Sequence, residues 1–266
     1  MEKQIFINDQ PVFYRVSGKG RPVMLVHGFG EDGNIWENQV PVLEKKYLLI
    51  VPDLPGSGRS APAKDVSMEA MAAVLKNILD DLRITACTMI GHSMGGYIVL
   101  AFAEKYPLYL HTIGLFHSSA YADDEEKKTA RKRGIEFIRD HGAARFLEQA
   151  IPNLFSDTFK AQYPDTVKEI IARYTNFPAQ SLVRYYEAMM QRPDRTHVLK
   201  EFPKAVLFIA GESDTSVPLE HSLQQCHLPG LSYIHILRNS GHMGMLEESA
   251  KSTQIVENFL LHDEIG

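Results

Sequence analysis

The chain has 266 residues, enough to bury a substantial core as one large α/β domain or as two smaller ones. Its 44% hydrophobic and 23% charged residues are ordinary for a globular protein and exclude long disordered stretches. The formal net charge of -5 and the isoelectric point near 6.1 give no basis for nucleic acid as a partner.

The sequence gives no indication of a signal peptide or of a membrane-spanning segment. Polar residues at 8–10 interrupt the N-terminal apolar run too early for a signal peptide. No stretch approaches the roughly 20 apolar residues that span a bilayer. Cys87 and Cys226 fall in or beside apolar segments without metal-binding spacing, as expected of buried free thiols in a reducing compartment. We therefore expect a cytoplasmic protein with no membrane partner.

The elements follow one another in a regular order along the chain. Residues 5–8 and 12–16 predict a hairpin of two short strands. Six apolar runs of strand length come next, at 22–27, 47–51, 86–90, 112–116, 205–210 and 233–237. Helical patterns lie between or after them, at 68–82, 95–106, 218–226 and 246–261. Near-continuous apolar strands that alternate with helices predict the α/β class, with a mostly parallel sheet covered by helices on both faces.

One region, 121–197, breaks this alternation because it contains no convincing strand. Residues 123–150 predict one or two amphipathic helices, and 165–174 and 179–191 predict two more. The mixed charges at 123–133 are typical of a solvated helix face with spaced opposite charges, and a functional charge patch is the alternative. We expect a helical lid at 118–197, inserted into a catalytic core formed by 1–117 and 198–266.

The sequence at 91–96, GHSMGG, places Ser93 between an apolar strand and a helix. A serine at such a sharp turn is forced into strained backbone geometry, which exposes its hydroxyl. The flanking glycines avoid collisions with the neighbouring helix and strand. This setting predicts a nucleophile, and the alternative is a serine that caps the helix.

A serine nucleophile needs a base and a group that orients the base. Of eleven histidines, His242 directly follows the last predicted strand and emerges at the same sheet edge as Ser93. The others, His117 among them, are predicted to shape turns or to be ordinary surface or core residues. Asp214 follows the strand at 205–210 and is favoured over Glu212, because a position further into the loop reaches toward the histidine.

Two further stretches complete the catalytic pattern. Asp53 opens the sequence DLPGSGRS, where a carboxylate that orders a turn is the expected role. The sequence HGFG from His27 follows a strand, and the backbone N–H of Phe29 is a candidate oxyanion donor. The N–H of Met94 is its predicted partner, at a helix start where the dipole favours negative charge.

Taken together, these stretches closely resemble the α/β-hydrolase superfamily, in particular lid-bearing small esterases, enol-lactonases and haloperoxidase-like enzymes. The matching stretches are HGFG from His27, DLPGSGRS from Asp53, GHSMGG from Gly91, GESD from Gly211 and SGHM from Ser240. The resemblance implies an eight-stranded sheet with the lid after the sixth strand. By motif position it implies Ser93, Asp214 and His242 as the triad, with Phe29 and Met94 at the oxyanion hole. Related haloalkane dehalogenases and epoxide hydrolases carry an aspartate in place of Ser93, which argues against both activities.

Candidates for substrate contact are fewer and less specific. Phe137, Tyr185 and Met189 are candidates to line an apolar pocket beneath the lid, although their helical spacing equally fits a lid core. Trp36 follows the oxyanion loop and either borders the site or packs in the core.

The predicted activity is hydrolysis of a small ester-like molecule, a carboxylic ester or lactone, through an acyl-enzyme and without metal or cofactor. One alternative keeps the triad but cleaves a carbon–carbon bond or transfers the acyl group to another acceptor. A low-turnover ligand-binding protein is the other alternative. The sequence makes no prediction of oligomeric state.

Overall fold

The computed structural model describes residues 1–262, so the last four residues of the predicted core, 263–266, lie outside the described part. The chain begins with an antiparallel hairpin of β1 (Glu2–Ile7) and β2 (Gln10–Ser17), as predicted. Its turn consists of Asn8 and Asp9, with φ of 49° and 61°. Asn and Asp tolerate this left-handed conformation better than most residues, and hairpin turns require it.

Eight strands form one sheet in the order β1-β2-β4-β3-β5-β6-β7-β8. The remaining strands are β3 (Pro22–Val26), β4 (Leu48–Pro52), β5 (Cys87–His92), β6 (Leu110–Phe116), β7 (Val206–Gly211) and β8 (Ser232–Leu237). The β2–β4 pair is antiparallel like the hairpin, and the other pairs are parallel. Every residue of β5 and β7 is buried, which explains why their sequences are mostly apolar. The predicted mostly parallel, eight-stranded sheet is confirmed.

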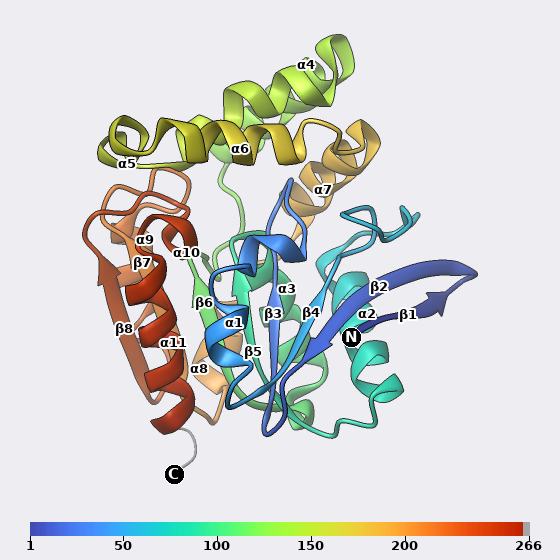
Figure 1. Cartoon of the computed structure of the whole chain (residues 1–266), viewed down its shortest axis with the longest axis vertical. Helices are drawn as coiled ribbons and strands as arrows, with labels where there is room; N and C mark the ends of the chain where they lie inside the picture. Colours follow the sequence, from blue (N-terminus) through green and yellow to red (C-terminus); the bar gives the residue numbers. More distant parts are fainter. Residues whose placement is uncertain (263–266) are drawn as a thin grey trace.

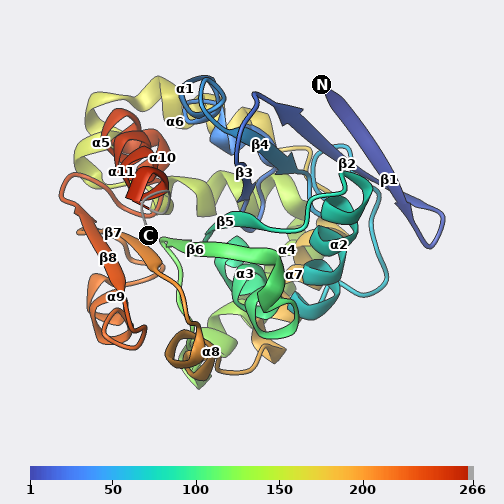
Figure 2. The same cartoon turned by 90° about the horizontal axis from the view of Figure 1, so that it is seen from below.

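Helices cover both faces of this sheet, as the view from below in Figure 2 shows. On one face lie α1 (Val40–Leu43) and α11 (Ser249–His262). On the other lie α2 (Met68–Asp81), α3 (Met94–Lys105), α8 (Thr196–Glu201) and α9 (Leu219–Gln225). The predicted helix at 246–261 is two helices, because Glu248 leaves helical geometry between α10 (Gly244–Glu247) and α11. Short 3-10 helices complete the fold at η1 (Gly33–Trp36), η2 (Pro107–Tyr109) and η3 (Ile151–Leu154).

Four helices between β6 and β7 form a separate layer, which we call the helical insertion. They are α4 (Glu125–Ala150), α5 (Asp157–Gln162), α6 (Pro164–Tyr174) and α7 (Ala179–Gln191). Figure 1 shows them stacked across the end of the sheet at which β6 leads into them. Gly142 interrupts α4 with φ 85° and ψ 164°, which kinks the helix. No helix within residues 1–262 is long and apolar enough to cross a membrane.

Two glycines permit the close approach of α3 to the sheet. A Cβ atom on Gly95 would lie 2.5 Å from the carbonyl oxygen of Val26, which ends β3. A Cβ atom on Gly91 would lie 2.3 Å from the carbonyl carbon of Gly95. The predicted collisions with the neighbouring strand and helix are therefore confirmed, and glycine at both positions allows the turn between β5 and α3 to form.

We predict that Gly95→Ala lowers the free energy of unfolding by about 1–3 kcal/mol, because the added methyl group overpacks the contact with Val26. Urea denaturation measures the loss. Gly230→Ala is the matched control, since a Cβ atom there meets nothing within 4 Å. Equal stability of the two variants would contradict the role assigned to Gly95.

Candidate active site

Ser93 occupies the sharp turn between β5 and α3. Its backbone lies at φ 51° and ψ −117°, a strained conformation for a residue with a side chain. The turn is held in place because the Ser93 N–H donates to the carbonyl oxygen of Phe116 at 3.0 Å and the Ser118 hydroxyl donates to the carbonyl oxygen of Ser93 at 2.7 Å. The Ser93 side chain makes no capping hydrogen bond to α3. The alternative role as a helix cap therefore has no support, and the hydroxyl is free for other chemistry.

Asp214 and His242 are in direct contact although they follow different strands. His242 Nδ1 donates a hydrogen bond of 2.8 Å to Asp214 Oδ2. Both residues are buried, whereas Glu212, the competing carboxylate of the same loop, is exposed. Asp53 orders its turn by accepting hydrogen bonds from the backbone N–H groups of Gly33 and Arg59, at 3.0 and 3.2 Å. The geometry thus singles out Asp214 as the carboxylate that contacts His242.

Four donors converge on the Asp214 carboxylate. Oδ1 accepts the backbone N–H groups of Ser216 and Val217 at 2.8 and 2.9 Å, and Oδ2 accepts both His242 and His117. Burial by itself would raise the pKa of this carboxyl, but the charge interaction with His242 and the hydrogen bonds from both histidines lower it well below its usual range. Asp214 is consequently ionised, and it fixes the tautomer of His242 with the proton on Nδ1.

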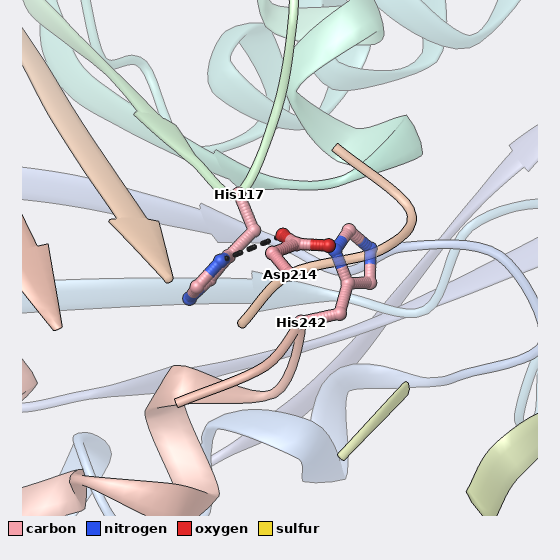
Figure 3. A group of neighbouring side chains, drawn as sticks. All are labelled: His117, Asp214 and His242. Atoms are coloured by element: carbon pink, nitrogen blue, oxygen red, sulfur yellow. Dashed lines mark hydrogen bonds and ion pairs between the residues drawn. The ribbon is translucent and has the colours of Figure 1, made fainter. Parts of the chain in front are cut away.

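His117 is a second histidine on the same carboxylate, and its role was not predicted from the sequence. It follows β6 directly, at φ 49°, and its Nδ1 donates to Asp214 Oδ2 at 3.0 Å. Burial lowers the pKa of His117 to about 4, against the opposing effect of Asp214, so the ring is neutral near pH 7. Figure 3 shows the rings of His117 and His242 on either side of Asp214. His117 directly follows β6, which lies next to β7 in the sheet, the strand that precedes Asp214. The position of His117 directly after a predicted strand was the signal in the sequence that could have indicated its role.

The three side chains also present potential metal-ligand atoms within 4.8 Å of one another. Both histidines, however, turn Nδ1 toward the same carboxylate oxygen, and each Nδ1 needs its proton to make that bond. A metal ion between them would have to displace both protons. The donor set therefore fits an oriented pair of imidazoles better than a metal centre.

A buried ion pair lies beside this cluster. His92 Nδ1 donates to Glu31 Oε2 at 3.0 Å, and His92 Nε2 donates to the carbonyl oxygen of His242 at 3.0 Å. Glu31 Oε2 also accepts the Gly28 N–H at 2.8 Å. Burial opposes both charges, yet the attraction between the partners raises the pKa of His92 and lowers the pKa of Glu31. The pair connects the loop after β3, the turn at Ser93 and the loop that carries His242.

A cavity of about 310 Å³ opens beneath the helical insertion. Ser93 and His242 both line it, together with Phe29 from the predicted oxyanion loop. The Phe29 ring stacks on Tyr186 of α7 with centroids 4.3 Å apart. Met94, the other predicted oxyanion residue, is buried at the first position of α3, where backbone N–H groups have no partner within the helix. The size of the cavity suits a small organic molecule.

The four predicted substrate contacts lie in different places. Met189 lines the cavity. Tyr185 is fully buried and donates to the carbonyl oxygen of Pro55, while the next residue, Tyr186, faces the cavity instead. The remaining two lie away from the cavity lining: Trp36 packs edge-on against His92 and Phe116, and Phe137 packs against His141 and Phe146. The rotation of α7 about its axis decides which of two adjacent tyrosines reaches the cavity.

Known proteins resemble the chain over nearly its whole length. The family described as "alpha/beta hydrolase fold" matches residues 21–115. A thermophilic esterase from Thermogutta terrifontis, solved with malate bound, superposes with a TM-score of 0.93 at 29% identity, covering 99% of both chains. The enol-lactonase from Burkholderia xenovorans superposes with a TM-score of 0.90 at 20% identity, covering 97% of this chain and 100% of that one. A 2-hydroxy-6-oxo-2,4-heptadienoate hydrolase from Pseudomonas putida is 25% identical over 93% of this chain and 91% of its own length.

We predict that His117→Asn changes how stability depends on pH. Because the folded pKa of His117, about 4, lies below its unfolded value near 6.5, His117 contributes stability fully above pH 6.5 and loses it as the pH falls toward 4. The difference in unfolding free energy between the wild type and the variant should shrink by roughly 2 kcal/mol between about pH 7 and pH 5. Asparagine also accepts the positive φ at this position.

Urea denaturation at several pH values provides the measurement. A loss of packing at His117 would lower stability equally at every pH. Parallel stability curves for the two proteins would therefore rule out the neutral, buried state assigned to His117.

Proposed function

Because this chain belongs to the α/β-hydrolase superfamily, we propose that it is a serine hydrolase that cleaves small carboxylic esters or lactones through an acyl-enzyme. The observation that carries the proposal is the hydrogen bond from His242 to the buried Asp214, in a cavity that Ser93 also lines. An ionised carboxylate, an oriented imidazole and an exposed hydroxyl are the three groups that acyl transfer by serine requires.

In the proposed mechanism, His242 Nδ1 keeps its proton on the Asp214 side, so Nε2 is the basic nitrogen. Nε2 accepts the Ser93 proton as the Ser93 oxygen attacks the carbonyl carbon. The imidazolium then returns that proton to the departing alcohol, which leaves an acyl-enzyme. Water repeats the sequence with His242 as base and releases the acid. The Asp214 charge stabilises the imidazolium in both halves.

The developing oxyanion requires hydrogen-bond donors on the opposite side of the carbonyl carbon. We assign this role to the backbone N–H groups of Phe29, in the loop after β3, and of Met94, at the start of α3. A single donor of this kind contributes about 3–4 kcal/mol to the transition state where one has been removed by mutation. The His92–Glu31 pair supports the assignment, since its bond to the Gly28 N–H orders the loop that carries Phe29.

The division of the chain supports the same proposal. We assign residues 1–117 and 198–266 to the catalytic core and 118–197 to a lid. The helical insertion contributes Tyr186 and Met189 to the cavity that contains Ser93. A lid of this kind excludes water from the reacting groups and shapes the space for the substrate.

Cleavage of a carbon–carbon bond by the same residues is the second candidate. It is favoured by the similarity to the Pseudomonas putida hydrolase, because carbon–carbon hydrolases are among the relatives of this chain. The esterase and the enol-lactonase favour ester chemistry, and the esterase has the higher identity to this chain. An acyltransferase and a low-turnover binding protein would use the same cavity and differ in the acceptor or in the rate.

We predict that Ser93→Ala lowers kcat/KM for p-nitrophenyl esters, from acetyl to octanoyl, by at least about a thousandfold. Release of p-nitrophenol measures the rate. Ser213→Ala is the matched control, since Ser213 is exposed and does not line the cavity. It should retain wild-type activity.

A fluorophosphonate probe separates the candidates when ester turnover is absent. Labelling of Ser93 without ester hydrolysis would favour carbon–carbon cleavage or acyl transfer. Absence of both labelling and turnover would favour the binding protein. Ester hydrolysis that survives Ser93→Ala would overturn the assigned nucleophile.

A further inference from the structure

Two cationic side chains from one turn of α4 line the same cavity as Ser93 and His242. Lys127 and Arg131 are four residues apart and therefore project from one face of the helix, with Ala130 beside them. We propose that the substrate carries a carboxylate in addition to its ester bond, and that Lys127 and Arg131 bind it. This inference rests on the proposed function and specifies which esters the site accepts.

Arg131 is held in a fixed orientation. Its Nε donates to Asp123 Oδ2 at 2.6 Å and its Nη2 donates to Asp123 Oδ1 at 3.3 Å. The guanidinium also lies over the Tyr186 ring, 5.4 Å from the centroid. These contacts use the Nε and Nη2 side of the group, and Nη1 takes no part in them. A guanidinium fixed on one side is pre-organised to bind a carboxylate on the other.

Asp123 does not neutralise this corner of the cavity, because two arginines share its single charge. Arg192 Nη1 lies 2.8 Å from Asp123 Oδ1, and its guanidinium stacks 3.8 Å from the centroid of Tyr97, which lines the cavity. Two guanidinium groups and one carboxylate leave an excess of one positive charge. Lys127 adds a second, and within residues 1–262 it forms no ion pair.

One carboxylate, that of Glu31, is among the described residues that line the cavity, and it is paired with the His92 imidazolium. Asp214 does not line the cavity, and it stays ionised because two histidines and two backbone N–H groups donate to it without cancelling its charge. The charged side chains of the cavity wall therefore have a net positive charge, and α4 carries the excess. A partly enclosed site with one sign of charge attracts ligands of the opposite sign.

Lys127 separates this inference from a purely structural explanation. Arg131 has a structural function as the partner of buried Asp123, so its presence alone does not require an anionic ligand. Lys127 is partly buried at the cavity, and among the described residues its ammonium group forms no ion pair with a carboxylate. Lys132, an exposed lysine of the same helix that does not line the cavity, is the matched control.

The test compares esters that differ by one carboxylate. Mono-p-nitrophenyl adipate is paired with p-nitrophenyl hexanoate for charge on the acyl side. O-acetylglycolate is paired with propyl acetate, measured by pH-stat, for charge on the alcohol side. We expect kcat/KM of the wild type to favour the anionic ester of at least one pair by about tenfold. Lys127→Gln should lower that ratio about fivefold, and Arg131→Gln should also lower it, whereas Lys132→Gln should leave it unchanged.

Two outcomes would overturn the inference while leaving ester hydrolysis in place. One is equal turnover of both members of each pair by the wild type. The other is an anion preference that Lys127→Gln does not reduce. Arg131→Gln also removes a partner of buried Asp123 and can therefore lower stability, so Lys127→Gln is the deciding variant.

A binding measurement decides the inference if no ester is hydrolysed. Calorimetry of Ser93→Ala with adipate needs no turnover, and hexanamide serves as the uncharged ligand. Adipate binding that weakens about fivefold on adding Lys127→Gln supports the anion site even then. Absence of adipate binding, or binding that is indifferent to Lys127→Gln, overturns it.

Discussion

The buried charge of Asp214 is the constraint on which the site depends. A carboxylate in a low-dielectric interior is unstable unless donors surround it. Here the donors come from three places: the carboxylate's own loop after β7, His117 at the end of β6 and His242 in the loop after β8. The hydrogen bonds to this one carboxylate therefore connect the segments that follow three neighbouring strands. The same hydrogen bond that stabilises Asp214 also sets the tautomer and orientation of His242.

A second buried ion pair, His92 with Glu31, holds the backbone of His242. His92 donates to the backbone carbonyl of His242 with one ring nitrogen and to Glu31 with the other. Since both nitrogens donate, both carry protons, and the imidazolium charge is balanced by Glu31. His242 is thus held through its side chain by Asp214 and through its backbone by His92. Groups fixed in this way need little reorganisation when charge develops during a reaction.

The candidate catalytic residues and the cavity wall that faces them come from different parts of the chain. The sheet edge supplies the candidate nucleophile, base and acid, whose positions follow from adjacent parallel strands. The helical insertion supplies the cationic side chains of the cavity wall, Lys127 and Arg131, together with Tyr186 and Met189. Helices that pack across a sheet edge can change their side chains without disturbing the buried charges below. This separation explains how one sheet architecture accommodates many substrates.

Local sequence determined much of this arrangement. Apolar runs of strand length identified the sheet, and GHSMGG placed Ser93 at a strand-to-helix turn, because each of these signals lies within a few adjacent residues. The order of the strands then put Asp214 and His242 at one edge, where they do form a hydrogen bond.

Tertiary structure alone decided the interactions between distant residues. His117 and Asp214 are 97 positions apart, and Glu31 and His92 are 61 apart, so no local pattern marks either contact. The cavity wall was also undetermined, since Tyr185 and Tyr186 project about 100° apart around α7 and only the packing of the helix decides that Tyr186 faces the cavity. Periodicity within a segment fixes the kind of element, whereas the packing of elements against one another fixes which side chains meet.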